Sequence, residues 1–170
     1  MKAAQINKYG GIEEFEINNE TSKPTVSKGK VLVEVYAASI NPFDKTVRSG
    51  FVKNMMPLNF PVVLGGDFSG VIKELGEGVA EFKVGDEVYG SANIFSGGSG
   101  SFAEFAILKA RNMAIRPKNI SFEEAAALPL VGSSAVQALE EHMKLQRDQR
   151  ILIHGGAGGI GHIAIQLAKN

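Results

Sequence analysis

The residues whose types and spacing could do chemistry form a glycine-rich run near the end of the chain. The run Gly156-Ala157-Gly158-Gly159-Ile160-Gly161 matches the pattern G-x-G-x-x-G. In a strand–turn–helix unit, glycines at these positions permit a tight turn, let backbone N–H groups approach a pyrophosphate, and let the helix pack closely on the strand. The phosphates then lie at the positive N-terminus of the helix. We therefore predict a dinucleotide-phosphate site at Gly156, Ala157, Gly158, Gly159, Ile160 and Gly161.

The flanking residues predict the elements that this site needs. Apolar residues 151–153 precede the glycines and predict a strand. Ile160, Ile163, Ala164 and Leu167 follow at positions i, i+3, i+4 and i+7, the spacing of one helical face. The alternative interpretation is that these glycines only make a tight turn, which binds no ligand.

The group that would contact the adenosine ribose is not in this sequence. It normally lies about 20 residues after the glycines, at the end of the next strand. The sequence runs to Asn170. A parallel sheet also needs more than one strand. We therefore expect the 170 residues to be a piece of a longer protein, or partner chains to supply the missing strands.

A helical pattern precedes the glycine run. Ser121-Phe122-Glu123-Glu124 is an S-x-x-E capping box and predicts the start of a helix. Pro129 should end or kink that helix at about Leu128. A second helix is expected from Gly132 to about Met143.

Residues before about 116 predict short strands. Glycine or proline recurs every eight to twelve residues between runs rich in valine, isoleucine and phenylalanine, which is typical of a sandwich or barrel. Residues 96–101 are a glycine- and serine-rich loop. The strands are expected at residues 31–36, 71–75, 84–90, 102–107 and 113–115.

Composition excludes several classes of protein. The chain has no cysteine, so disulfide scaffolds, cysteine-ligated zinc and thiol nucleophiles are excluded. Its 18 basic and 18 acidic residues balance without a basic block, which argues against nucleic-acid binding. No signal peptide or membrane span is evident. We expect a cytoplasmic protein with no membrane partner.

Six motifs, in this order, make a family recognisable. The chain resembles the N-terminal half of the zinc-free quinone oxidoreductase branch of the medium-chain dehydrogenase/reductase superfamily. This resemblance implies a mixed β and α/β fold, with a GroES-like catalytic β-barrel over residues 1–120 and the first β-α unit of a Rossmann domain over 121–170. The motifs are Asn41-Pro42-Phe43-Asp44, Gly65-Gly66-Asp67-Phe68-Ser69-Gly70, Val84-Gly85-Asp86-Glu87-Val88, Gly100-Ser101-Phe102-Ala103-Glu104, Ala125-Ala126-Ala127-Leu128-Pro129 and His154-Gly155-Gly156-Ala157-Gly158.

The resemblance also implies a reaction without metal. Zinc-dependent members of the superfamily place a cysteine ligand where this chain has Asn41 and a histidine ligand where it has Gly66. Without a Lewis acid, a quinone or an α,β-unsaturated carbonyl is the better hydride acceptor, because hydride adds to carbon while charge spreads onto a distant oxygen. We expect NADPH as the cofactor, because the resembled branch mostly uses it.

The resemblance assigns site residues one by one. It implies that Asn41 faces the nicotinamide, that Asp44 lies near the same cleft, and that Ser134 takes the place of a threonine lining the pocket. A tyrosine or lysine found in relatives two residues after the aspartate is replaced by Thr46. The proton donor is therefore open between Thr46, acting through water, and Lys45.

Plainer interpretations stay open. Asp44, Lys45 and Arg48 could form a solvated turn, and Asp67 could be a turn residue that bonds its own backbone. The partner is expected to be a small quinone or enone, and the full-length protein to be a homo-oligomer. The alternative function is a catalytically silent GroES-like domain, or a truncated fragment without a complete cofactor site.

Overall fold

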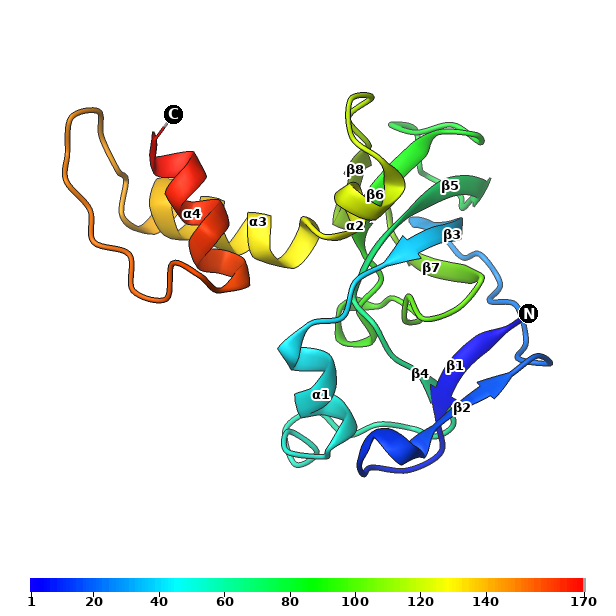
Figure 1. Ribbon diagram of the computed structural model, residues 1–170. Helices are drawn as coiled ribbons and strands as arrows, with labels where there is room; N and C mark the ends of the chain where they lie inside the picture. The colour runs from blue at the N-terminus through cyan, green and yellow to red at the C-terminus, as the bar shows by residue number, and fades with distance from the viewer. Residues whose placement is uncertain (170) are drawn as a thin grey trace. The chain divides into compact units, whose positions relative to one another are not determined.

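The chain divides into two compact units, which are described separately. The computed structural model describes residues 1–169, and the first unit ends at Ala127. It therefore includes helix α2 (Phe122–Ala126), which packs on strands β3 and β5 of that unit (Figure 1). A boundary at residue 120, as expected from the sequence, would separate this helix from the strands that it covers.

A five-stranded antiparallel sheet forms the main body of the first unit. Its strand order is β7-β3-β5-β6-β8. Alternate residues of its two long central strands, such as Val31, Val33, Phe68 and Ile72, are fully buried and form its core. The strands are β3 (Lys30–Ala38), β5 (Asp67–Leu75), β6 (Glu87–Ser91), β7 (Phe105–Lys109) and β8 (Met113–Ile115).

Two of the expected strands begin later than predicted. Residues 84–86 form a turn in which Gly85 adopts a φ of +91°, so that β6 starts only at Glu87. Residues 102–104 connect the two sheets instead of starting β7. Ala4 N–H donates to Phe102 O at 2.8 Å, and Val35 N–H donates to Glu104 O at 2.9 Å.

A second, three-stranded sheet was not expected from the sequence. Its order is β2-β1-β4, with β1 (Ala3–Ile6), β2 (Phe15–Asn18) and β4 (Val62–Val63). These strands have four, four and two residues. Such short runs carry too little alternation to be distinguished from loops.

Helix α1 (Pro42–Arg48) lies beside this small sheet and is drawn in cyan in Figure 1. Pro42 stands at its first position, where a missing N–H costs nothing. Val47 anchors the helix in a second core together with Ile6 and Leu64.

Helix α2 begins at the predicted capping box. Glu124 N–H donates to Ser121 Oγ at 3.2 Å, and Ser121 N–H donates back to Glu124 Oε2 at 2.8 Å. The Phe122 ring packs between Tyr36, with ring centroids 4.7 Å apart, and the guanidinium of Arg116, 4.6 Å from the ring centroid. These contacts hold the helix on the main sheet.

The second unit is helical. Pro129 separates α2 from α3 (Pro129–Val136), as expected, and a π-helical turn, Gln137–His142, follows directly. Helix α4 (Gly159–Lys169) packs on α3 through Ala164, which is buried against Ala135 and Leu139.

The predicted strand at residues 151–153 is not formed. Leu152 is 79% exposed, whereas Ile151 and Ile153 pack on the helical core. A strand needs a neighbour for its backbone hydrogen bonds, and none lies beside this segment among residues 1–169. The structure thus contains the turn and the helix of the expected β-α unit without its strand.

Candidate functional site

The N-terminus of α1 fixes the first two predicted site residues to each other. Asn41 is the N-cap, in an extended conformation. Its backbone N–H donates to Asp44 Oδ2 at 2.7 Å, and Asp44 N–H donates to Asn41 O at 2.9 Å. The Asp44 carboxylate therefore cannot turn without breaking the start of the helix.

Asp67 holds the side chain of Asn41 from the other direction. Asn41 Nδ2 donates to Asp67 Oδ2 at 3.0 Å, and the Ser39 hydroxyl lies 3.5 Å from the same oxygen. Asp67 opens strand β5 and is only 2% exposed. The Asn41 amide is thus fixed with its nitrogen toward a buried carboxylate. This buried contact argues against the interpretation in which the residues at the start of α1 form only a solvated turn.

Burial raises the pKa of the Asp44 carboxyl above its ordinary value, and the hydrogen bond from Asn41 N–H partly opposes this shift. A half-buried carboxyl loses part of the hydration that favours its charged form. Asp44 is therefore easier to protonate than a surface aspartate.

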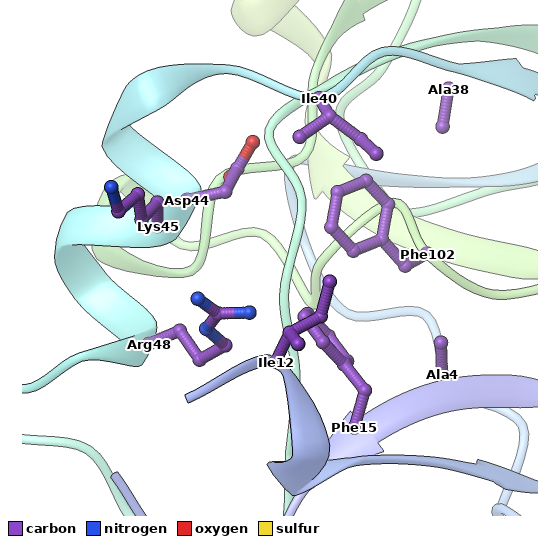
Figure 2. Close-up of a pocket in the computed structure, with 9 residues that line it drawn as sticks. All are labelled: Ala4, Ile12, Phe15, Ala38, Ile40, Asp44, Lys45, Arg48 and Phe102. Atoms are coloured by element: carbon purple, nitrogen blue, oxygen red, sulfur yellow. The ribbon is translucent and has the colours of Figure 1, made fainter. Parts of the chain in front are cut away.

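An apolar hollow of about 390 Å³ opens beside α1, and we call it the α1 pocket. Figure 2 shows α1 on one side, with phenylalanine rings and aliphatic side chains facing it. Two predicted site residues, Asp44 and Lys45, belong to its wall. The lining residues are Ala4, Ile12, Phe15, Ala38, Ile40, Asp44, Lys45, Arg48 and Phe102.

Thr46 lies outside the lining of the α1 pocket. Its hydroxyl donates to Pro42 O at 3.1 Å, one turn earlier in the helix. Lys45, by contrast, carries an exposed side chain and borders the pocket. Figure 2 shows the Lys45 side chain extending from α1 away from the phenylalanine rings, so neither predicted proton donor points into the pocket.

The glycine turn in the second unit has the geometry that its sequence predicts. Gly158 N–H donates to Gly155 O at 2.9 Å, and α4 starts at Gly159. A Cβ at Gly161 would overlap the Gly155 carbonyl oxygen, so only glycine allows the helix to sit this close to the turn. Gly158 and Gly159 are exposed. A tight, open turn at a helix N-terminus fits the phosphates of a dinucleotide.

Ser134 lies in the same unit as the glycine turn. It is half-buried on α3, one helical turn after Val131. Val131 touches the turn, because a Cβ on Gly159 would lie 3.0 Å from Val131 Cγ1. The structure thus brings Ser134's helix against the predicted phosphate turn.

No group of three or more histidine, cysteine, aspartate or glutamate side chains among residues 1–169 could hold a metal ion. No helix in that part of the chain is both long and apolar enough to cross a membrane.

Comparison with known proteins identifies the family. Residues 27–118 match the alcohol dehydrogenase GroES-like domain. The chain belongs to the alcohol dehydrogenase GroES-like family. Its similar proteins are quinone oxidoreductases of the medium-chain dehydrogenase/reductase superfamily, which confirms the resemblance inferred from the six motifs.

Three relatives illustrate the match to this GroES-like protein. A 2-methylene-furan-3-one reductase of Solanum lycopersicum is 38% identical over 100% of the chain and 44% of its own length. The quinone oxidoreductase structure from Coxiella burnetii has a TM-score of 0.87 and 38% identity over 99% of this chain and 53% of that one. The Escherichia coli quinone oxidoreductase complexed with NADPH has a TM-score of 0.85 and 31% identity over 99% and 49%.

The GroES-like chain therefore spans about half the length of the relatives that it matches. The sequence motifs predict Asp44 and Lys45, which line the α1 pocket, but they do not predict Phe15, Arg48 and Phe102 as lining residues. The lining residues of the pocket come from four separate segments of the chain, so no short sequence pattern predicts them. The one sequence signal for the pocket is the spacing of residues 44, 45 and 48, which would place their side chains on one face of a helix.

Proposed function

We propose that the protein containing this chain is an oxidoreductase that reduces quinones or α,β-unsaturated carbonyl compounds with NADPH and without zinc. The observation that carries the proposal is the network at the start of α1, where Asp44 and buried Asp67 fix Asn41. The named functions of similar proteins, a quinone oxidoreductase with NADPH and a reductase of an unsaturated furanone, support it.

NADPH, when bound, would supply the hydride. The glycine turn would bind the pyrophosphate through backbone N–H groups at the start of α4. Asn41 would orient the nicotinamide by hydrogen bonding, and its bond to Asp67 holds the amide in one orientation. Ser134, in the same unit as the glycine turn, would be a further contact of the cofactor.

Lys45 and Thr46 are the two candidate proton sources. After hydride addition the acceptor carries negative charge on oxygen, which needs a donor. The ammonium of Lys45 has three N–H groups and is not tied by an ion pair in the described residues. Thr46 would have to break its bond to Pro42 O before it could donate.

Zinc independence has support from the ligand positions. The chain has no cysteine, and its asparagine and glycine at positions 41 and 66 are poor zinc ligands. A chelator should therefore leave the rate unchanged.

The test is to measure NADPH consumption by the whole gene product, that is, this chain together with any residues that follow residue 170. With a 1,4-quinone or an enone, the absorbance of NADPH should fall. G161A should abolish this activity, because its new methyl group overlaps Gly155 O. The matched control is G132A, since a Cβ at Gly132 on α3 meets nothing within 4 Å. No consumption with any such acceptor would refute the proposal.

A further inference from the structure

The α1 pocket combines apolar walls with a cationic side. Phe15 and Phe102, with ring centroids 6.3 Å apart, form part of its wall. Ile12 and Ile40, which line the same pocket, are 76% and 82% exposed, so the pocket continues into an exposed apolar surface. Such a surface gains free energy when an apolar molecule covers it.

The charges beside this pocket do not cancel. Lys45 and Arg48 both border it, and the four ion pairs among residues 1–169 include neither of them. Asp44 is the single acidic lining residue, and its carboxylate is already engaged by Asn41 N–H. Arg48 is the cationic group that faces a ligand in the pocket, since the Lys45 side chain extends away from it in Figure 2.

Arg48 is the residue with unused bonding capacity. Its Nε is buried and has no hydrogen-bond partner within residues 1–169. Its guanidinium carbon lies 5.7 Å from the centroid of the Phe15 ring, and Figure 2 shows the group extending from α1 toward Ile12. A part-buried guanidinium without an acceptor is costly, and a carboxylate matches its planar array of donors.

We propose that the α1 pocket binds a planar apolar small molecule bearing a carboxylate, with the rings against Phe15 and Phe102 and the carboxylate at Arg48. The volume of about 390 Å³ is in the lower part of the range for small-molecule sites, roughly 300–1,000 Å³. A two-ring aromatic acid is of suitable size. The pocket shares Asp44 and Lys45 with the proposed reductase site, but all its lining residues lie in the first unit, so binding at Arg48 can be measured without NADPH.

The test is a calorimetric titration of the chain with 2-naphthoate, in the absence of NADPH. We expect saturable binding, and about tenfold weaker binding of the uncharged 2-naphthamide, which has the same rings. R48Q should bring naphthoate down to the affinity of the amide, because it keeps a polar side chain but removes the charge. R111Q is the matched control, since Arg111 is exposed and lies outside the pocket.

A second measurement covers the case in which R48Q fails to fold. In the unmodified chain, naphthoate should shift the NMR signals of the Ile12 and Ile40 methyl groups and the Phe102 ring. The proposal would be overturned if naphthoate did not bind at millimolar concentration, or if naphthoate and naphthamide bound with equal affinity. It would also be overturned if folded R48Q bound naphthoate with unchanged affinity, or if the NMR shifts were confined to other residues. The titration contains no NADPH, so its outcome is separate from the test of NADPH consumption.

Discussion

At the scale of residues, one asparagine is held by two aspartates with different roles. Asp44 bonds to the backbone of Asn41 and sets the helix start, whereas buried Asp67 bonds to its side-chain amide. Family motifs in the sequence point to Asn41 and Asp44. The bond to Asp67 spans 26 residues and joins two elements, so it emerges only when β5 is paired and α1 is placed.

The substitution N41D should destabilise the first unit at neutral pH. It replaces the donor Nδ2 with an oxygen and brings a second carboxylate next to buried Asp67. Loss of this hydrogen bond and repulsion between the two carboxylates should lower the free energy of unfolding by about 1–3 kcal/mol. Denaturant titration measures this, and the loss should shrink at acidic pH.

N93D is the control for that experiment. Asn93 is similarly half-buried, and its Oδ1 accepts from Phe95 N–H at 2.9 Å, a bond that a carboxylate can also accept. An equal loss of stability in both variants would contradict the role given to Asp67.

Asp44 makes the stability of the first unit depend on pH. Its pKa is raised in the folded state above the ordinary value of 3.8, so folding favours the protonated form. The contribution to stability is complete below that ordinary value and is lost as pH rises through the folded-state pKa. D44N keeps an acceptor for Asn41 N–H and cannot ionise.

The stability of D44N relative to the unmodified chain should therefore increase between about pH 3.5 and pH 7. Urea titrations of both proteins across this range measure the difference. If the difference stays constant or decreases toward neutral pH, burial does not raise the pKa of the Asp44 carboxyl.

At the scale of elements, the sequence predicts those that carry local signals. The Ser121–Glu124 capping box locates the start of α2, whereas α3 starts at Pro129, three residues before the predicted Gly132. Helix α1 has only seven residues and is stabilised by Val47 in the core, so its local pattern was too short to predict a helix there. The strand expected at residues 151–153 fails for the opposite reason: its local pattern is clear, but no pairing partner lies beside it.

The capping box gives a prediction at this scale. S121A removes the acceptor for Glu124 N–H and should lower the unfolding free energy of the first unit by about 0.5–2 kcal/mol. Thermal unfolding with S133A as the control measures the loss, because Ser133 is exposed on α3. If S121A and S133A unfold at the same temperature, α2 does not contribute to the first unit's stability.

At the scale of the whole molecule, the chain joins a GroES-like domain to a helical unit that carries the glycine turn. That the glycine turn binds a dinucleotide remains a proposal. Among residues 1–169, no strand pairs with residues 151–153. Reduction of an acceptor is accordingly a property proposed for the protein as a whole.

In the proposed reaction, hydride passes from NADPH to the β-carbon of a conjugated acceptor. The transfer is tested with an enone and NADPH that carries two deuterium atoms on its hydride-donating carbon, and the product is analysed by mass spectrometry and NMR. We expect one deuterium per product molecule, bound to the β-carbon. A reduced product with no deuterium on carbon, or with deuterium on the carbonyl carbon, would contradict it.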